Sequence, residues 1–456
     1  MIDPATASLL VGHLLLGEAV FAIAVLLALS GLDDLFVDLV FLGRSLWHRA
    51  IVERRSPRVT AEAMHAVPPE PMAIIIPAWD EAAVIGVMLR RLLAGLDYPD
   101  YRVFVGLYPN DPAGRAAVAA ICDDRLQLVL CDRPGPTTKS DCLNHLWHAA
   151  LAHEGAAGRR FKAIVLHDAE DLLHSQELRV QNALIPRFAM VQLPVIPLPD
   201  ARSRWVSGHY LDEFAANHIK DIVVREALGA AVPSAGVACA IDRDILGRIA
   251  DAAGGAPFDP TCLTEDYELG LRITALVRVH SRSEPGIVAT REHFPASFAT
   301  ARRQKTRWLV GIGLSGWDRL GWSGGLADRY MLLRDRKAIA AALLAMLAYV
   351  ATLLMLADAV LVTQVSLPPL LDRTTLWLVT FNAALLIWRL VMRAACTGHD
   401  HGWAEGLRSV PRALVSSFIN AAAAWSACGR YTTSLRTGTA LGWDKTAHRF
   451  PDAPPA

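Results

Sequence analysis

Asp168 and Glu170 stand two residues apart after a short apolar run, and this pair of carboxylates could hold a divalent cation. Adjacent carboxylates repel each other unless a cation neutralises them, and Mg²⁺ is commonly bound by one or two carboxylates together with substrate phosphates. Such a cation stabilises the negative charge on a diphosphate leaving group. The alternative is a solvated acidic turn that caps the next helix. His167 and His174 are weaker candidates for a transition-metal site, with histidines satisfied by their neighbours as the alternative.

A second acidic motif, Thr264-Glu265-Asp266, opens a predicted helix. Thr264 suits the N-cap position, and acidic side chains are favourable near the positive end of the helix dipole. This capping role explains the composition of the motif on its own. A catalytic role for the two acids therefore needs support from outside the motif.

A cationic and aromatic motif, Gln304-Lys305-Thr306-Arg307-Trp308, precedes a long apolar stretch. An indole face suits stacking against the C–H groups of a sugar, and a guanidinium suits a phosphate. The same composition is typical of an amphipathic helix at a membrane interface, with Arg at the headgroups and Trp in the aromatic belt. One helix can serve both roles.

Asp80, Asp111 and Lys139 are further polar candidates because each follows a predicted strand or begins a predicted helix. The two acids can be explained as turn residues, since Asn110-Asp111-Pro112 is a favourable turn sequence. Lys139 begins a helix, where its charge opposes the helix dipole. An anionic group nearby, such as a diphosphate, would compensate for this.

Short β-branched runs alternate with amphipathic segments from Met72 onward. The predicted strands are Met72–Ile76, Arg102–Leu107, Leu126–Cys131, Ala163–Leu166 and Met190–Val195, and the predicted helices include Ala82–Ala94, Ser140–Leu151 and Tyr210–Leu228. This alternation indicates right-handed βαβ units and a largely parallel sheet. Ligands bind such sheets at the carboxyl ends of the strands, where Asp80, Asp111 and Asp168 are expected.

Three apolar stretches are long enough to cross a bilayer: Leu9–Leu29, Ala338–Val365 and about Leu376–Met392. Arginines follow the first stretch and none precedes it, so we expect an uncleaved anchor with its N-terminus outside and the next domain in the cytoplasm. Ala413–Cys428 is short and contains Asn420. We interpret it as an interfacial or re-entrant helix, because a further crossing would place a basic tail outside.

Charge and cysteine content exclude two classes of protein. Lys+Arg and Asp+Glu each total 45, so no excess of positive charge favours nucleic acid as a partner. Seven scattered cysteines form no C-x-x-C pair, which indicates reduced thiols rather than a disulfide framework. Hydrophobic residues make up 53% of the chain and gather at its two ends, as expected for membrane segments.

In this order and between apolar segments, the three motifs resemble the active-site series of the processive family-2 glycosyltransferases, the cellulose-synthase-like group. Further segments resemble one subgroup, the phage-adsorption-protein-B-like glycosyltransferases of the bacterial inner membrane. These segments are Pro77–Glu81, Tyr108–Pro112, Pro134–Thr137, His167–Asp171, Gly208–Phe214, Val232–Val237 and Trp443–His448. The resemblance runs from about Met72 to Pro451.

The resemblance implies a GT-A catalytic domain, Rossmann-like with a mostly parallel sheet, that takes a UDP-sugar donor. Asp266 is then the general base of an inverting transfer, with Asp168 and Glu265 as the other catalytic acids. The donor-binding residues are Asp80, Asp111, Lys139 and Asp168, and the metal ligands for Mg²⁺ or Mn²⁺ are Asp168 and Glu170. The residues that hold the acceptor and the diphosphate are Gln304, Arg307 and Trp308.

The expected protein is a multi-pass protein of the bacterial inner membrane, in which a cytoplasmic GT-A domain is combined with an α-helical transmembrane bundle. We predict an anchor at 1–31, a cytoplasmic linker at 32–71, the GT-A domain at 72–299, interfacial helices at 300–330, two transmembrane helices at 338–395 and a cytoplasmic or interfacial segment at 396–456. The expected acceptor is a surface polysaccharide, exported with an outer-membrane partner.

Two departures from the resembled group affect these expectations. Glu170 stands where many relatives carry a second Asp, which makes the set of metal ligands less definite. Larger relatives continue into a domain that senses cyclic di-GMP, whereas the tail here lacks an R-x-x-x-R cluster. We therefore expect any such control to come from another protein.

Two other functions fit part of the sequence. A non-catalytic membrane receptor or secretion scaffold would keep the fold without turnover, but it would not need the three motifs together. A membrane-anchored, metal-dependent phosphohydrolase would need a cluster of His and Asp ligands, and the histidines here are dispersed.

Overall fold

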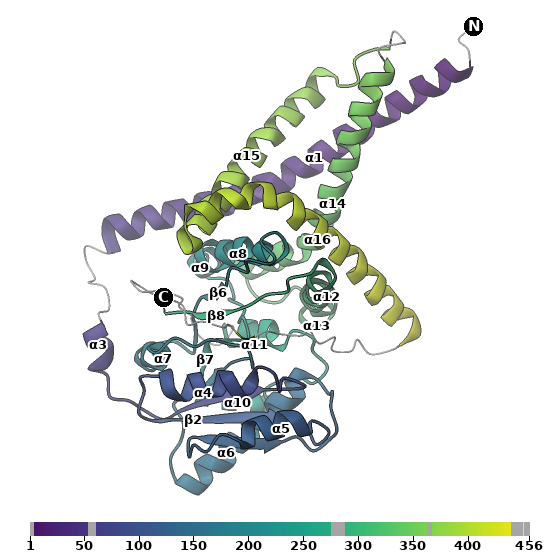
Figure 1. Ribbon diagram of the computed structural model, residues 1–456. Coiled ribbons are helices and arrows are strands. Elements are labelled where there is room, and N and C mark those ends of the chain that lie inside the picture. The colour runs from purple at the N-terminus through teal and green to yellow at the C-terminus, as the bar shows by residue number, and fades with distance from the viewer. Residues whose placement is uncertain (1–3, 53–60, 275–287, 363–366, 439–449, 451–456) are drawn as a thin grey trace.

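The computed structural model describes residues 4–52, 61–274, 288–362, 367–438 and 450. An arm of long helices stands on an α/β domain, and a layer of further helices lies between the two (Figure 1). The Trp443–His448 motif lies outside the described residues.

A six-stranded sheet in the order β3-β2-β1-β4-β7-β5 forms the centre of the α/β domain. β1 (Met72–Pro77) pairs in parallel with β2 (Tyr101–Leu107) and with β4 (Ala163–Leu166), and β2 pairs in parallel with β3 (Leu126–Leu130). β7 (Cys239–Asp242) runs antiparallel to β4 and to β5 (Met190–Gln192). The expected mostly parallel sheet is therefore confirmed, with one reversed strand that the sequence pattern did not indicate.

The prediction of one strand over Met190–Val195 is wrong. The segment divides into β5 and β6 (Val195–Pro197), and β6 pairs in parallel with β8 (Thr290–Glu292) in a second, two-stranded sheet. Pro194 lies between the two strands, and because proline has no N–H it cannot continue the hydrogen-bond ladder.

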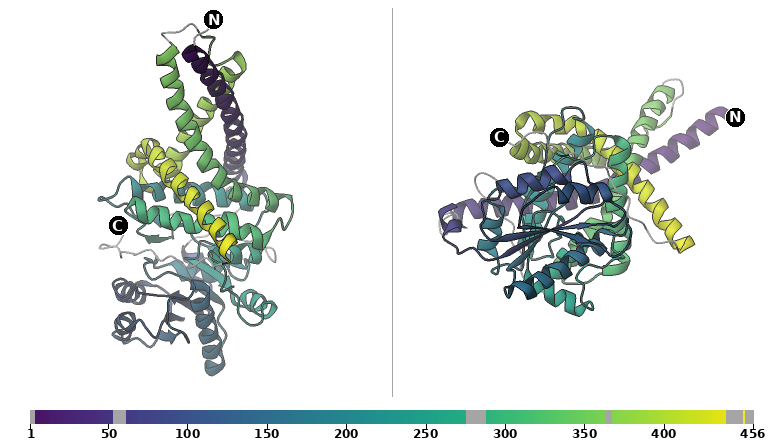
Figure 2. Two further views of the ribbon diagram at one scale, coloured as in Figure 1. Left: turned by 90° about the vertical axis from the view of Figure 1, so that its right-hand side faces the viewer. Right: turned by 60° about the horizontal axis from the view of Figure 1, so that its bottom comes forward.

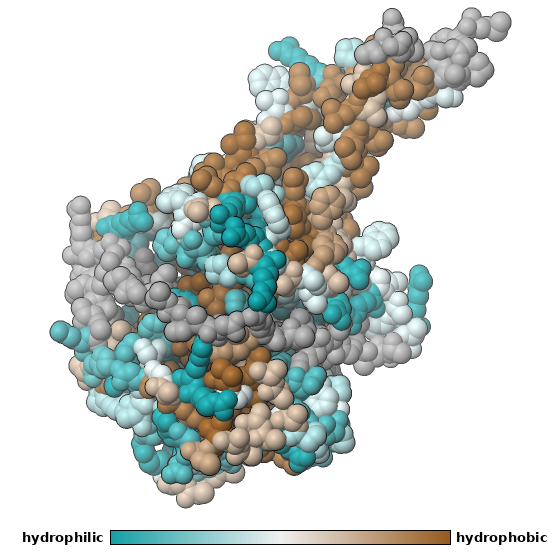
Figure 3. Space-filling view, in the orientation of Figure 1, coloured by the Kyte–Doolittle hydropathy of each residue, from teal (hydrophilic) through white to brown (hydrophobic). Residues whose placement is uncertain are grey.

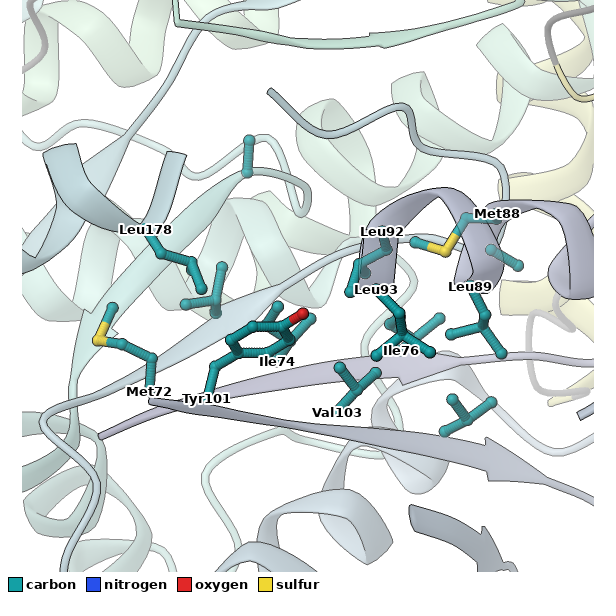
Figure 4. Packing of buried hydrophobic residues seen from close by; sticks show 14 of the residues in the cluster. Met72, Ile74, Ile76, Met88, Leu89, Leu92, Leu93, Tyr101, Val103 and Leu178 are labelled. Carbon is teal, nitrogen blue, oxygen red and sulfur yellow. The ribbon is translucent and has the colours of Figure 1, made fainter. Parts of the chain in front are cut away.

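Helices cover both faces of the main sheet, as the right-hand view of Figure 2 shows. They are α4 (Ile85–Gly95), α5 (Pro112–Ala119), α6 (Lys139–Ala157), α7 (Glu177–Leu184), α10 (Arg243–Ala252) and α11 (Glu265–Thr274). Met72, Ile74 and Ile76 of β1 belong to one buried cluster (Figure 4), whereas Ala73 and Ile75 belong to another. This alternation follows from the two-residue period of a strand and explains why β1 is apolar throughout.

Three helices of the arm are long and apolar enough to cross a membrane: α1 (Pro4–Trp47), α14 (Leu326–Val362) and α15 (Arg373–His401). Apolar side chains cover most of this arm in Figure 3. α1 continues well past Leu29, where the apolar stretch ends, because Arg334 and Lys337 of α14 pair with Asp33. A π-helical turn at His48–Val52 follows α1, and a short helix, α3 (Ala61–His65), precedes the sheet.

The middle layer contains α8 (Val206–Ala216), α9 (Ile222–Ala227), α12 (Phe298–Leu309), α13 (Gly316–Leu320) and α16 (Trp403–Thr437), with π-helical turns at Asn217–Asp221 and Val310–Ser315. The predicted helix Tyr210–Leu228 corresponds to α8, the first of these turns and α9. A buried ion cluster joins the layer to the arm, because Asp212 of α8 accepts hydrogen bonds from Arg393 of α15 (2.7 Å) and Arg412 of α16 (2.5 Å). The helices around the site therefore have fixed positions relative to the arm.

Candidate active site

A cavity of about 660 Å³ opens at the carboxyl ends of β1 and β4 and reaches the middle layer and the base of the arm. Eight of the ten residues predicted to form a site line it. They are Lys139, Asp168, Glu170, Glu265, Asp266, Gln304, Arg307 and Trp308. The structure thus brings all three sequence motifs, which span about 140 residues of chain, to one cavity.

Asp80 and Asp111 do not line the cavity but lie against each other beside it. Asp111 is buried as the N-cap of α5, where one carboxylate oxygen accepts the Gly114 N–H (2.8 Å) and the other accepts the Asp80 N–H (3.1 Å). Asp80 has a positive φ of 54°, which is unusual for a residue other than glycine. Asp111 thus fixes the strained turn that carries Asp80, and nucleotide contact by either residue remains a prediction.

Lys139 brings a positive charge to the middle of the acidic lining. As the first residue of α6, it places Nζ 2.5 Å from Asp168 Oδ1 and 3.9 Å from Glu265 Oε1. Burial lowers the pKa of this ammonium, but the surrounding carboxylates of Asp168, Glu265 and Asp266 outweigh burial and raise it. An anionic group near Lys139 was expected from the sequence. These protein carboxylates are part of that group.

The two acids of the second motif lie side by side at the start of α11. Burial and the neighbouring Asp266 raise the pKa of Glu265 to about 7, and burial also raises the pKa of Asp266. Lys139 opposes both shifts. Gly236 has a φ of 77°, and a side chain there would begin 2.6 Å from Asp266 Oδ2. The backbone of Gly236 therefore forms a close wall against this carboxylate.

Asp168 and Glu170 fit a divalent cation only in combination with a substrate. Among the described residues no group of three or more His, Cys, Asp or Glu side chains could hold a metal ion by itself. Two hard carboxylate ligands, one of them already charge-paired with Lys139, nevertheless match the Mg²⁺ sites in which phosphate oxygens complete the coordination. The residues present thus fit a cation that arrives with a diphosphate.

His167 is fully engaged by two acids and is not a metal ligand in this structure. Its Nδ1 lies 2.6 Å from Asp171 and its Nε2 lies 2.7 Å from Glu177, and all three side chains are buried. Burial lowers the pKa of His167, but the two carboxylates outweigh it and raise the pKa to about 10. Asp171 also accepts the Asp168 N–H (3.1 Å), so this charged triad supports the turn that carries Asp168.

The third motif lies on α12 and provides an aromatic wall. The Trp308 ring packs near Tyr210 (6.1 Å between centroids) and Phe214 (6.2 Å), and Lys305 Nζ lies 5.1 Å from its centroid. Gln304 Oε1 and Arg307 Nε are buried without a hydrogen-bond partner among the described residues. Unsatisfied polar atoms at a cavity wall are available to a polar ligand.

Several lining residues were not predicted as site residues from the sequence. Phe214 comes from α8, and Glu292 and Phe294 come from β8 and the loop after it. Burial, followed by the nearby acids Asp171, Glu170 and Asp168, raises the pKa of Glu292 well above the usual range. The segment around Glu292 carries no local signal of its role, because β8 is positioned by pairing with β6, about 95 residues earlier.

Comparisons with known proteins agree with this arrangement. The family described as "Glycosyltransferase like family 2" matches residues 68–311. Bacteriophage adsorption protein B of Escherichia coli (strain K12) and bacteriophage N4 adsorption protein B of Escherichia coli O157:H7 are each 37% identical to this chain in an alignment of 474 positions, gaps included, that covers 96% of the chain. The chain spans 63% of the length of these relatives.

A solved structure with the same fold is the mannosyltransferase PcManGT from Pyrobaculum calidifontis in complex with GDP-Man and Mn²⁺. The similarity covers 86% of this chain and 99% of the mannosyltransferase, with a TM-score of 0.51 and 17% identity. The expected GT-A fold is thereby confirmed, and at this identity the likeness extends to the fold alone.

Proposed function

The chain belongs to the glycosyltransferase-like family 2, and from this premise we propose that it transfers a sugar, with inversion, from a UDP-sugar to a growing surface polysaccharide. The observation that carries the proposal is that Asp266 lines one cavity together with Lys139 and Asp168 and with Arg307 and Trp308. A base, an anion site and a sugar-binding wall are what a one-step transfer needs.

In the proposed reaction, Asp266 takes the proton of the acceptor hydroxyl as the hydroxyl oxygen forms its bond to the anomeric carbon of the donor sugar. The bond from that carbon to the diphosphate breaks, and UDP leaves with the electron pair. One displacement inverts the anomeric centre, and no covalent sugar intermediate is needed. Burial, which raises the pKa of Asp266, makes its carboxylate a better proton acceptor than an exposed aspartate.

The leaving diphosphate is placed against Lys139 and Arg307, the two cations that lower the pKa values of both Glu265 and Asp266. A divalent cation bound by Asp168 and Glu170 would neutralise charge that develops on the diphosphate. Arg307 has a buried Nε without a partner among the described residues, and Lys139 can exchange its contact with Asp168 for one with phosphate. These two side chains therefore supply the positive charge that holds the diphosphate of the donor.

We also propose that α1, α14 and α15 cross the bacterial inner membrane, with the GT-A domain in the cytoplasm. α16 would then lie in the interface, since its exposed face carries Trp403, Leu407, Leu414 and Phe418 at helical spacing. Phe418 stacks on Tyr349 of α14, with ring centroids 6.1 Å apart, so this apolar face is continuous with the apolar arm. Such a position agrees with the sequence-based interpretation of Ala413–Cys428.

A surface polymer as product is supported by two observations. The cavity lining also includes Asp38 of α1 and Arg389 and Met392 of α15. An acceptor bound at Asp266 can therefore extend toward the arm. The relatives are named for bacteriophage adsorption, a process of the cell surface. Export through an outer-membrane partner belongs to the same proposal.

The test is release of nucleoside diphosphate by membranes that contain the protein. A panel of UDP-sugars, with GDP-mannose added because the similar mannosyltransferase was solved with it, is supplied with Mg²⁺ or Mn²⁺. Release from one donor only when an acceptor is present supports the transferase. Release without acceptor would instead identify a phosphohydrolase. The absence of release with every donor, in folded protein, would favour a receptor or scaffold.

Replacing Lys139 with Met should shift the acidic side of the pH–rate profile to higher pH by about one unit. Lys139 lowers the pKa of both Glu265 and Asp266, so its removal raises them. A base acts only when ionised, and a higher pKa therefore moves the rise in turnover upward in pH. The measurement is kcat at saturating donor from pH 5 to 9.

A matched control is Lys162→Met, which removes another lysine that is paired with an acid, Glu70 (2.7 Å), but does not line the cavity. The pH profile of this control should follow that of the wild type. An unchanged profile in Lys139→Met would mean that Lys139 does not control the charge of the acidic pair.

A further inference from the structure

The helix that carries Asp266 is bound by elements outside the α/β domain. Tyr267, the next residue of α11, donates a hydrogen bond from Oη to Asp335 Oδ2 of α14 (2.5 Å). Glu268 accepts a hydrogen bond from Arg319 of α13 (2.8 Å). The start of α11 is thus fixed from the membrane side.

Asp335, with 21% of its side chain exposed, is the centre of a polar cluster in the cavity wall. Besides the hydrogen bond from Tyr267, Asp335 accepts one from the guanidinium of Arg225 of α9. The same guanidinium also donates to the Met331 carbonyl of α14 (3.3 Å). Tyr267 and Arg225 are each about 6% exposed. A buried guanidinium is stable only with its counter-ion, so this cluster holds α9, α11 and α14 in one arrangement.

Tyr267 connects this cluster directly to Asp266. Its backbone N–H donates to Asp266 Oδ1 (2.7 Å), while its hydroxyl reaches Asp335. On the other side, Gly236 lies so close to Asp266 Oδ2 that not even a methyl group would fit. The carboxylate of Asp266 is therefore held between the Gly236 backbone and a peptide whose side chain is fixed by α14.

We propose that Asp335 of α14 is a positioning residue for Asp266 and acts through the hydroxyl of Tyr267. The inference rests on the proposed function, because it explains how Asp266 is held in position as the general base. α14 is one of the three helices long and apolar enough to cross a membrane, so the contact links the base to the membrane arm. A displacement of about 1 Å in a reacting group can cost 10²-fold in rate, which makes such a contact effective.

The experiment compares Tyr267→Phe with Tyr330→Phe. Tyr330, also on α14, donates an equivalent hydrogen bond to Asp33 of α1 (2.5 Å) and does not line the cavity. Tyr267→Phe should lower kcat about tenfold, with KM for the donor changed less than twofold, because only the base is misplaced. Tyr330→Phe should leave both constants unchanged while removing the same kind of bond from the same helix.

Asp335→Asn and Asp335→Ala give a graded series. Asn keeps an oxygen that can accept from Tyr267, so it should retain more turnover than Ala. Equal losses of kcat in Tyr267→Phe and Tyr330→Phe, or no loss in Tyr267→Phe, would overturn the proposal. A KM for the donor that rises in Tyr267→Phe by the same factor as kcat falls would also overturn the proposal.

Hydrogen exchange of the α11 amides provides a readout that does not need turnover. Exchange over Glu265–Thr274 should increase in Tyr267→Phe and stay at the wild-type level in Tyr330→Phe. If no donor is turned over but exchange changes as expected, the proposed function fails while the contact between α14 and α11 stands. Unchanged exchange in Tyr267→Phe would exclude the contact as a restraint on α11.

Discussion

Replacing Asp266 with Asn should lower kcat about 10³-fold while changing the KM for the donor little. The amide matches the carboxylate in shape and fits beside Gly236, but it cannot accept the proton of the acceptor hydroxyl. The donor-side residues, Lys139 and Asp168, keep their ion pair in this variant. The measurement is steady-state release of UDP at saturating acceptor, together with binding of the donor to the inactive variant.

Glu265→Gln is the informative comparison, because the two acids lie together at the start of α11 and both have raised pKa values. We expect Glu265→Gln to lose less activity than Asp266→Asn. Asp244→Asn, on an exposed acid of α10 with 68% of its side chain accessible, should have no effect. If Glu265→Gln were inactive and Asp266→Asn retained turnover, the roles of the two acids would be exchanged.

Much of the site was predictable because local chemistry defines the ends of elements. Apolar runs identified β1, β2 and β4, and parallel pairing places the residues after β1 and β4 at one edge. Thr264 was expected to cap a helix, and α11 does begin at Glu265, but the buried Thr264 Oγ1 has no hydrogen-bond partner among the described residues, so its side chain does not cap the helix. The three motifs could be assigned to one site only through the resemblance, since composition alone was also explained by caps and an interfacial helix.

Other features depend on partners that are distant in sequence. The membrane anchor was predicted to end at residue 31, yet α1 continues because Arg334 and Lys337 neutralise the charge of Asp33 from about 300 residues away. Both carboxylate oxygens of Asp111 accept backbone N–H groups, one of them from Asp80, 31 residues earlier, and nucleotide contact by Asp111 stays a prediction. In contrast, the division of β5 from β6 had a local signal in Pro194.

The contact between Tyr267 and Asp335 also lies beyond sequence analysis. Nothing in Thr264-Glu265-Asp266-Tyr267 distinguishes a tyrosine that packs in a core from one that donates a hydrogen bond to a distant helix. The acid that accepts its hydrogen bond comes 68 residues later, in the polar first part of α14. Only the fold, which brings the start of α11 next to α14, defines this pair.

Removing divalent cations with a chelator should abolish turnover, and Asp168→Asn should lower kcat/KM for the donor about 10²-fold even when Mn²⁺ is restored. Asn keeps the size of Asp168 but removes the charge on which both Lys139 and a cation depend. Glu170→Gln should lower kcat/KM for the donor less, and a higher Mn²⁺ concentration should partly restore it. Asp132→Asn, with 88% of its side chain exposed beside His145, is the matched control and should be unaffected.

A double variant separates the two roles of Asp168. If Asp168 served only to neutralise Lys139, then Lys139→Met would remove the need for it, and adding Asp168→Asn would cause no further loss. If Asp168 also binds the cation of the donor complex, the loss in the double variant should exceed that of Lys139→Met alone. Full turnover in chelator, together with an inactive Asp168→Asn, would contradict the cation site and leave the carboxylate with the first role. The ion pair of 2.5 Å is compatible with both roles, so this comparison, and not the geometry, decides between them.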